Sequence, residues 1–280
     1  MTKISVVMIS FNAGELIEPA LRSARWADEI VVVDSGSTDG TPAIGRRYAN
    51  RFLHEDWRGF TAQKQFAVSL ASNDWVFILD QDEEISPELA AQIQALDDDV
   101  LSRCDLFEVR RRNYAMGRPV RAWWPDHQSR LFHRGRCRWA DEAIHDRRHP
   151  SEPGRTAKLT GWLEHRRHCR EGFFDFNVGR ISADRLRRAV MQMHDRGKLC
   201  HWWDVFIHPT AAFIKSYFMK RGFLDGVFGF MVARQQAHTT YLRYAALWAI
   251  QHDIAYQASD DDDQPRSTDS VEEATDAAAE

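Results

Sequence analysis

The chain has 280 residues, 44% hydrophobic and 28% charged, a composition typical of one large globular domain or two small ones. Its net charge of −4 is the sum of segments with opposite charges. Residues 1–100 carry −9, residues 101–170 +9, residues 171–258 +4 and residues 259–280 −8. The sequence has no run of about 18 uncharged apolar residues, no basic leader and no C-x-x-C, so we expect no membrane span, secretion signal, disulfide framework or structural zinc site.

The first hundred residues alternate short apolar runs with helix-like patterns, which is typical of an α/β sheet with helices on both faces. Two helix starts are marked by Thr41-Pro42 and Ser86-Pro87, because each pair places a side-chain oxygen at the N-cap and proline at the first helical position. The predicted strands are residues 4–9, 30–33 and 75–79, and the predicted helices are residues 15–25, 42–48 and 87–96.

The middle of the chain differs from this pattern. Strand-like pieces at residues 106–110 and 130–133 stand between connections rich in Arg, Trp, Pro and Gly. We therefore expect irregular loops over the sheet edge within residues 105–160.

The C-terminal part becomes helical from residue 173, and residues 205–250 combine aromatic with basic side chains. That content suits helices lying on an anionic membrane surface, and it equally suits helices packed on the preceding domain. The tail cannot bury enough apolar surface to order itself, so we expect it to be disordered. The predicted divisions are a domain of residues 1–170 with halves 1–100 and 101–170, a helical region of residues 171–258, and a tail of residues 259–280.

The candidate chemistry lies at the carboxyl ends of predicted strands, where ligands bind in open α/β sheets. The sequence contains no G-x-G-x-x-G, G-x-x-x-x-G-K-[ST] or G-x-S-x-G, which excludes the commonest dinucleotide oxidoreductases, P-loop enzymes and serine hydrolases. The second strand ends in Asp34, followed by small residues that would let a ligand approach the backbone. Asp34 could accept hydrogen bonds from a base or a ribose, although an ordinary strand-to-helix loop would look similar.

A second acidic segment, Asp80-Gln81-Asp82-Glu83-Glu84, follows the strand at residues 75–79. Alternate residues of an extended chain point the same way, so Asp80 and Asp82 can present two carboxylates to one divalent cation. The remaining sites of that cation would go to water and to phosphates, as a nucleoside diphosphate requires. An acidic, solvated helix start is the plainer alternative, and it accounts better for Glu83 and Glu84 than for Asp80.

Several further motifs follow one another along the chain. They are residues 5–12 (SVVMISFN), 26–41 (WADEIVVVDSGSTDGT), 57–60 (WRGF) with Gln63-Lys64, 74–83 (DWVFILDQDE), 130–132 (RLF), 143–146 (AIHD) and 222–226 (GFLDG). Together, over about residues 3–250, they resemble family 2 glycosyltransferases, and more narrowly the bacterial lipopolysaccharide-core β-glucosyltransferase group.

The resemblance implies a Rossmann-like GT-A fold with a C-terminal helical extension, and an inverting, Mg²⁺- or Mn²⁺-assisted sugar transfer from a nucleoside diphosphate. Two departures from the usual motifs are Gln65, in place of Asn, and Gln81, in place of a small residue. The positions that match the family's donor-site motifs are Ser10, Asn12, Asp34, Ser35, Lys64 and Asp80, and those that match its metal-binding D-x-D are Asp80 and Asp82. His145 could join the metal and diphosphate site, although a lone histidine in a loop is more often a hydrogen-bonded structural residue.

Inverting transfer also needs a base that takes a proton from the acceptor hydroxyl. The sequence offers Asp141, Glu142 and Asp146, of which we rank Asp146 first and Glu142 second. Related sequences commonly carry His-Glu where this chain has His145-Asp146, so Asp146 would be a shorter base. Arg130 could steer an anionic acceptor or steady the diphosphate, or belong to a solvated basic face.

The cluster His165-Arg-Arg-His168-Cys169 superficially resembles a metal site. Two arginines would repel a cation and no second ligand pair stands at a suitable spacing, so we interpret it as a basic loop or strand end near the acceptor.

The resulting hypothesis is a cytoplasmic hexosyltransferase, peripheral on the inner face of the cytoplasmic membrane. It would move glucose from UDP-glucose onto a lipid-linked saccharide such as the lipopolysaccharide inner core. A sugar-phosphate nucleotidyltransferase and a non-catalytic nucleotide-fold binding or scaffold protein stay open as alternatives. Nucleic-acid binding is not expected, because no nucleic-acid motif surrounds the tryptophans of the basic segment.

Overall fold

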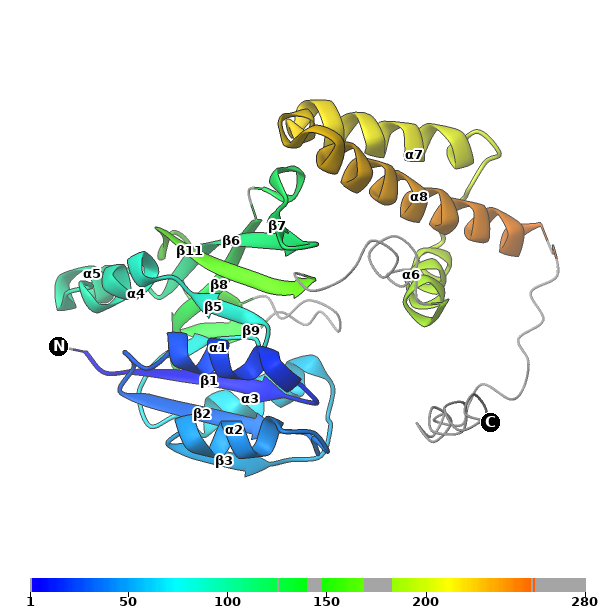
Figure 1. Ribbon diagram of the computed structural model, residues 1–280. Coiled ribbons are helices and arrows are strands. Elements are labelled where there is room, and N and C mark those ends of the chain that lie inside the picture. Colours follow the sequence, from blue (N-terminus) through cyan, green and yellow to red (C-terminus); the bar gives the residue numbers. More distant parts are fainter. Residues whose placement is uncertain (1, 125, 140–147, 169–182, 253, 255–280) are drawn as a thin grey trace, which may run out of the picture. The chain divides into compact units, whose positions relative to one another are not determined.

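The computed structural model has a large mixed α/β sheet and a helical C-terminal part (Figure 1). Contacts divide the chain into one unit of Met1–Ile181 with Ala212–Gln236, and another of Ser182–Ala211 with Ala237–Glu280. The predicted boundary at residue 170 and the predicted tail lie outside the described residues. The structure describes residues 2–124, 126–139, 148–168, 183–252 and 254.

Four parallel strands form the first part of the sheet, in the order β3-β2-β1-β4. The α/β fold class predicted from the alternating pattern is therefore confirmed. Two short elements, β3 and α3, lie where no element was predicted. The bounds are β1 Ile4–Ser10, α1 Ile17–Ser23, β2 Glu29–Asp34, α2 Thr41–Tyr48, β3 Arg51–His54, α3 Phe60–Ser69 and β4 Trp75–Ile78, with a 3-10 turn at Gly14–Leu16.

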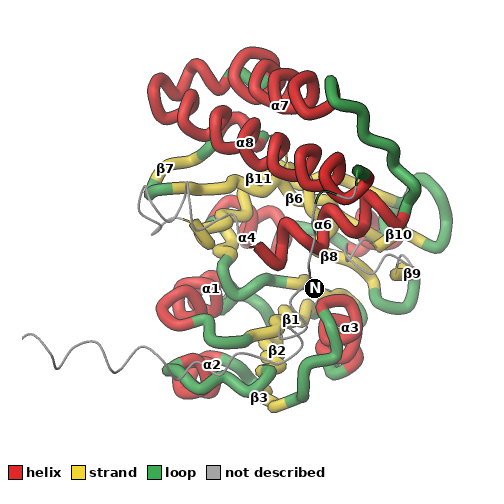
Figure 2. The backbone as a smooth tube through the Cα atoms, turned by 90° about the vertical axis from the view of Figure 1, so that its right-hand side faces the viewer, coloured by secondary structure: helices red, strands yellow, loops and turns green. Residues whose placement is uncertain are grey.

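Helices cover both faces of these strands. Figure 2 shows α1 and α2 on one face and α3 on the other. One apolar cluster joins Val6 and Val32 to Leu21 of α1, and the other joins Val7 and Val33 to Ala67 of α3. Strands buried on both faces need continuous apolar runs, and such runs made these strands readable from the sequence.

The two predicted helix starts have different outcomes. Ser86 caps α4 (Pro87–Gln94) as predicted, because its side chain accepts a hydrogen bond from the Leu89 N–H at 3.2 Å. The predicted cap at Thr41 is wrong, since Thr41 lies inside α2. Its hydroxyl instead accepts hydrogen bonds from the Ala13 and Gly14 N–H groups, which ties the end of β1 to α2.

The predicted strand pieces at residues 106–110 and 130–133 are confirmed, since they lie in β6 and β8. The irregular loops predicted around them are wrong for much of the described region, because it supplies the longest strands of the sheet. Strand β8 pairs antiparallel with β4, and the sheet continues through β6 and β11 to β5. The bounds are β5 Glu83–Ile85, α5 Asp98–Arg103, β6 Leu106–Ala115, β7 Arg118–Pro119, a 3-10 turn at Arg121–Trp123, β8 Asp126–His133, β9 Cys137–Trp139, β10 Arg148–Pro150 and β11 Thr156–His168.

The C-terminal part is helical, as the sequence pattern indicates. In the first unit Val232 packs on Ala115, Val120 and Ala122, and Arg121 pairs with Asp225 at 2.9 Å. No helix among the described residues is both long and apolar enough to span a bilayer. The bounds are α6 Ala183–Asp195, α7 Asp204–Ile214, a π-helical turn at Lys215–Met219, a 3-10 turn at Gly222–Asp225 and α8 Gly226–Gln251.

Candidate active site

The ends of β1 and β2 form a hydrogen-bonded loop around Asp34, which is only 3% exposed. Its carboxylate accepts hydrogen bonds from the Ser10 hydroxyl at 2.9 Å, the Ser37 N–H at 2.8 Å and the Gly36 N–H at 3.1 Å. In this structure Asp34 therefore holds the loop in shape, and the backbone around Ser35 is fixed with it.

Asn12 closes the same loop from the other strand. It has a φ of +42°, and its side-chain oxygen accepts a hydrogen bond from the Thr38 N–H at 2.9 Å. The Ser35 hydroxyl in turn accepts a hydrogen bond from the Gln63 amide at 3.1 Å. The structure thus brings the predicted donor-site residues Ser10, Asn12 and Ser35 together with Asp34 at one edge of the sheet.

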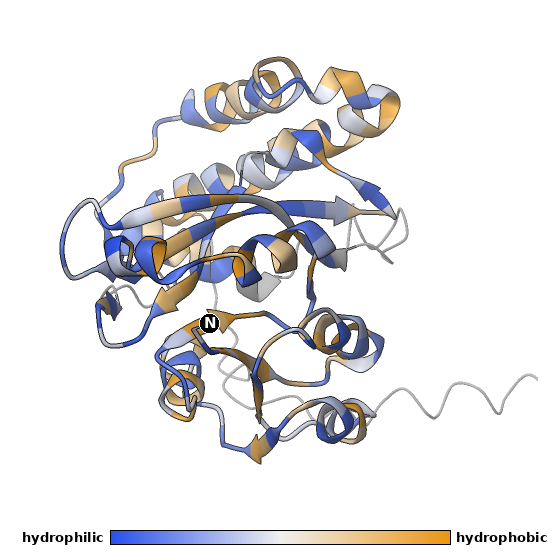
Figure 3. Ribbon diagram, turned by 90° about the vertical axis from the view of Figure 1, so that its left-hand side faces the viewer, coloured by the Kyte–Doolittle hydropathy of each residue, from blue (hydrophilic) through white to orange (hydrophobic). Residues whose placement is uncertain are grey.

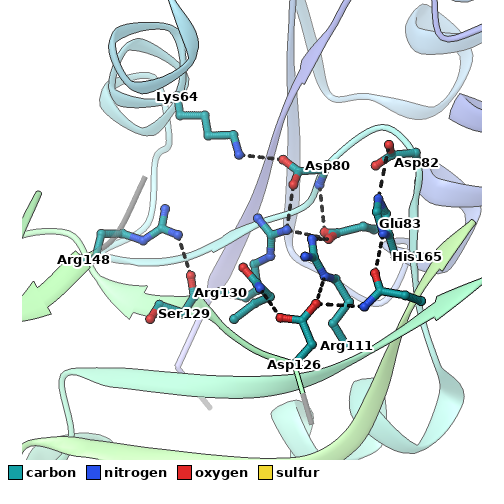
Figure 4. A network of polar contacts seen from close by, with 12 residues as sticks. Lys64, Asp80, Asp82, Glu83, Arg111, Asp126, Ser129, Arg130, Arg148 and His165 are labelled. Atoms are coloured by element: carbon teal, nitrogen blue, oxygen red, sulfur yellow. Dashed lines mark hydrogen bonds and ion pairs between the residues drawn. The ribbon is translucent and has the colours of Figure 1, made fainter. Parts of the chain in front are cut away.

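Asp80 lies between two cations just beyond the end of β4 (Figure 4). One carboxylate oxygen is 2.7 Å from Lys64 Nζ, and the other is 2.6 Å from an Arg130 guanidinium nitrogen. Burial opposes ionisation of this carboxyl, but the charges of Arg130 and Lys64 outweigh it and hold the pKa of Asp80 well below its usual range. The sequence predicted three separate residues here, and the structure joins them in one ion cluster.

Glu83 is the buried carboxylate of this cluster and contacts Arg130, Arg111 and the Asp80 backbone. It is fully buried, lies 2.5 Å from Arg130 and 3.2 Å from Arg111, and accepts a hydrogen bond from the Asp80 N–H at 3.3 Å. A buried carboxylate needs such partners because burying an unpaired charge is costly. The alternative of a solvated helix start, which accounted better for Glu83 than for Asp80, is wrong for Glu83, because this residue is buried and begins β5.

Asp82 points toward a different partner, His165 on β11. The His165 Nε2 lies 3.5 Å from an Asp82 carboxylate oxygen, and its Nδ1 lies 2.7 Å from the Asn113 side-chain oxygen. The sequence alone indicated for His165 only a basic loop or strand end near the acceptor. Pairing of β11 with β5 brings it to Asp82, and that pairing of distant segments has no local sequence signal.

Gln81 joins the acidic loop to the end of β1. Its side-chain oxygen accepts a hydrogen bond from the Phe11 N–H at 2.9 Å, and its amide donates one to the Phe11 carbonyl at 3.3 Å. The residue that departs from the related motifs therefore holds the loop bearing Asp80 and Asp82 against the neighbouring strand.

The described part of the chain contains no group of three His, Cys, Asp or Glu side chains arranged for a metal ion. Asp82, with a side chain 10% exposed, still offers a hard oxygen ligand of the kind that Mg²⁺ and Mn²⁺ accept. The arrangement fits a cation whose other ligands are water and the phosphates of a bound nucleotide. The candidates Asp141, Glu142, His145 and Asp146 lie outside the described residues.

The chain is similar to known glycosyltransferases. The model of the glycosyl transferase family 2 matches residues 5–157. The chain is 28% identical over 259 residues to the lipopolysaccharide core biosynthesis glycosyltransferase LpsC of Rhizobium meliloti (strain 1021), covering 88% of this chain and 92% of that protein. An uncharacterized glycosyltransferase of Rickettsia felis is 42% identical over 95 residues, or 34% of each chain.

Two solved structures are similar at low identity. S. aureus TarS 1-349 has a TM-score of 0.44 at 14% identity, covering 91% of this chain and 93% of that chain. Glucosyl-3-phosphoglycerate synthase from Mycobacterium tuberculosis, solved with Mn²⁺, UDP-glucose and phosphoglyceric acid, has a TM-score of 0.33 at 23% identity, covering 40% of this chain and 44% of that chain. Since the family model spans more than half of the chain, the protein belongs to glycosyl transferase family 2, as the sequence motifs predicted.

Proposed function

We propose that this family 2 glycosyltransferase is a metal-dependent, inverting enzyme that transfers glucose from UDP-glucose to a lipid-linked saccharide such as the lipopolysaccharide inner core. The observation that carries the proposal is the pair Asp80 and Asp82 beside Lys64 and the Asp34 loop, within a family 2 chain. The similarity to LpsC supports an acceptor of the lipopolysaccharide core.

The described side chains support distinct roles in donor binding. Asp82 would hold Mg²⁺ or Mn²⁺, and when bound this cation would neutralise charge on the departing diphosphate. Asp80 is held by Lys64 and Arg130, which makes its carboxylate a fixed acceptor for a ribose hydroxyl. Because Lys64 is 9% exposed and already oriented, little side-chain entropy is lost when it meets a phosphate.

The candidate general bases lie in the basic middle of the chain, residues 101–170. Asp146, or Glu142 in its place, would take the proton from the attacking hydroxyl. In the inverting reaction that hydroxyl oxygen bonds to the anomeric carbon as the bond to the diphosphate oxygen breaks. The nucleoside diphosphate leaves, and the sugar is joined to the acceptor with inverted configuration. His145 would take part in the site that binds the metal and the diphosphate.

A membrane-facing role is proposed for the aromatic stretch of the first unit, which we place on the inner face of the cytoplasmic membrane. Large apolar side chains are exposed there next to Lys215, Lys220 and Arg221, a combination that binds anionic interfaces. Flotation with anionic vesicles should be strong at low salt and weak at high salt. The exposed apolar residues of this stretch are Ile214, Phe218, Met219, Phe223, Leu224, Val227 and Phe230.

The central test is the exchange Asp82→Asn, with Asp99→Asn on α5 as an exposed control. Donor hydrolysis and transfer from UDP-glucose should fall about a hundredfold or more in Asp82→Asn, while thermal unfolding and the control variant stay unchanged. Chelator should abolish activity of the native protein, and Mg²⁺ or Mn²⁺ should restore it.

Three outcomes would contradict the proposal. Full activity in excess chelator or in Asp82→Asn would remove the metal role. Release of pyrophosphate from a nucleoside triphosphate and a sugar phosphate would identify a nucleotidyltransferase. Binding of UDP without turnover on any acceptor would favour a non-catalytic protein.

A further inference from the structure

A second, cationic pocket lies within the first unit, apart from the acidic loop. Its volume is about 340 Å³, and β6, β8, β11, the segment after the turn at Arg121–Trp123 and the turns at residues 220–224 line it. The residues that characterise it are Arg110, Trp124, Trp162, Lys220 and Arg221, which we call the Trp-Arg pocket. Neither the family motifs nor the proposed donor site uses these residues.

Two tryptophan rings hold the arginines of this pocket in place. The guanidinium carbons of Arg110 and Arg112 each lie 4.3 Å from the Trp162 ring centre, and Trp124 lies 5.5 Å from Trp162. A guanidinium stacked on an aromatic face keeps its N–H donors directed outward in its own plane. Stacking therefore orients these donors before any ligand arrives, which lowers the entropic cost of binding an anion.

Of the four cations that line the pocket, Arg121 is paired with Asp225 at 2.9 Å, and within the described part of the chain the other three are not balanced by carboxylates. Among the residues that the structure describes, Arg110, Lys220 and Arg221 form no ion pair with an acidic side chain. The pocket's own acidic residue, Asp126, is already engaged by Arg111 at 2.8 Å, Asn113 at 2.9 Å and Gln128 at 2.6 Å. Three uncompensated cations around one cavity favour an anionic ligand.

Asp126 also joins the pocket to the candidate active site. Its partner Arg111 contacts Glu83 at 3.2 Å, and Glu83 contacts Arg130, which holds Asp80. A continuous set of ion pairs thus runs from the wall of the pocket to the acidic loop (Figure 4). A ligand of the pocket would lie against β8, the strand whose Arg130 holds Asp80.

We propose that the Trp-Arg pocket binds the phosphate or carboxylate group of an anionic saccharide. That this saccharide is the acceptor rests on the proposed function. Planar guanidinium donors match both anionic groups in a bidentate manner, and the tryptophan surface offers apolar contact to a sugar ring. A neutral saccharide would leave the three cations without a counterion.

Calorimetric titration of the full chain with mannose 6-phosphate, galacturonic acid, methyl mannoside and inorganic phosphate tests this proposal. The variants are Arg110→Gln, Lys220→Gln and Arg221→Asn, where asparagine suits the φ of +56° at this position. Arg103→Gln on α5, whose side chain is 69% exposed, is the charge-matched control. Metal-dependent UDP-glucose hydrolysis and binding to anionic vesicles are measured on the same proteins.

We expect the anionic sugars to bind the native protein and the control, and methyl mannoside to bind neither. Each pocket variant should weaken binding of the anionic sugars about tenfold, with UDP-glucose hydrolysis unchanged. If the native protein hydrolyses no donor but the variants still lose anionic-sugar binding, the proposed function fails and the binding site stands.

Other results would overturn the site itself. Equal binding of anionic sugars by the native protein and all three variants would place the ligand elsewhere. Loss of vesicle binding in Arg110→Gln, whose side chain lies outside the proposed membrane-facing stretch, with binding of the anionic sugars retained, would identify a lipid-headgroup site instead. Binding of inorganic phosphate without binding of either anionic sugar would remove the saccharide from the proposal.

Discussion

The parallel strands β1, β2 and β4 and the long strands β6 and β11 belong to one sheet but are stabilised differently. All six residues of β2 are buried, and its central side chains are aliphatic. Strand β6 instead carries Arg110, Arg111 and Arg112 in succession, each partly buried. The hydropathy colours of Figure 3 show this contrast between mainly apolar strands and strands of mixed character.

The arginines of the second region replace apolar packing with paired charges and ring contacts. Arg112 lies 3.4 Å from Glu164 and stacks on Trp162, while Arg111 contacts Glu83. A sheet can therefore contain long strands in which apolar positions alternate with partly buried arginines, when these arginines have an ion-pair or aromatic partner. We expect the two regions to respond differently to mutation, pH and salt.

The largest effect should come from the apolar region. Phe77 on β4 is fully buried, so Phe77→Ala should lower the free energy of unfolding by about 3–5 kcal/mol through lost burial and a residual cavity. Phe60→Ala is the control, because Phe60 is 67% exposed and its truncation should cost little. Urea unfolding measures both, and a loss below about 1 kcal/mol for Phe77→Ala would contradict this account of the core.

Arg130→Met should cost nearly as much, about 3 kcal/mol, because it removes a cation from the buried carboxylate of Glu83. Arg111 remains 3.2 Å from Glu83, so the loss should stay at the lower end of the range for broken buried pairs. Equilibrium urea unfolding near neutral pH, with Arg103→Met as the exposed control, is the measurement. Unchanged stability would show that apolar contacts alone hold this region.

The pH dependence of unfolding should distinguish the stability loss of Arg130→Met from that of Phe77→Ala. The pKa of Asp80 is lower in the folded protein than in the unfolded chain, where it is about 3.9, so ionised Asp80 stabilises the native state above about pH 4. This contribution is lost as the pH falls toward the lowered pKa. The deficit of Arg130→Met should therefore shrink below about pH 4, whereas that of Phe77→Ala should not. Parallel deficits across this range would contradict the electrostatic origin.

The same difference explains which parts of the fold the sequence predicts. Continuous apolar runs identify β1, β2 and β4, and Ser86-Pro87 identifies the start of α4. Strand β11 was missed because its buried positions alternate with partly buried charged or polar residues, such as Glu164 and His165. Local periodicity measures hydrophobicity, and it does not register a buried charge whose partner is distant in sequence.

The candidate site also contains residues that the sequence predicts and residues whose roles only the folded chain shows. Asp34, Asp80 and Asp82 follow apolar strands, so the sequence predicts that they lie at one edge of the sheet. The roles of Glu83, His165 and Gln81 depend on contacts with Arg130, Asp82 and Phe11, which only the folded chain brings together. Their residue types suit many structural settings, and no spacing in the sequence distinguishes these partners.

Ser86→Ala removes a hydroxyl that connects helix α4 to the long strand β11. The Ser86 hydroxyl accepts hydrogen bonds at 3.2 Å from the Leu89 N–H of α4 and from the Trp162 N–H of β11. Its removal should cost about 1 kcal/mol, the usual value of an N-cap. Urea unfolding of Ser86→Ala beside Ser86→Thr, which retains a hydroxyl, checks this, and equal losses in both variants would argue against the hydroxyl.

The smallest effect should come from an exposed ion pair within the charged region. Lys158 on β11 lies 3.7 Å from Glu108 on β6, and their side chains are 64% and 30% exposed. Lys158→Gln should change the free energy of unfolding by no more than about 0.5 kcal/mol, and high salt should remove even that difference, because solvent and ions screen exposed charges. Unfolding of both proteins at low and high salt is the measurement. If Lys158→Gln cost as much as Arg130→Met, the number of charges rather than their burial would stabilise this region, so a small, salt-sensitive loss would identify burial as the deciding property.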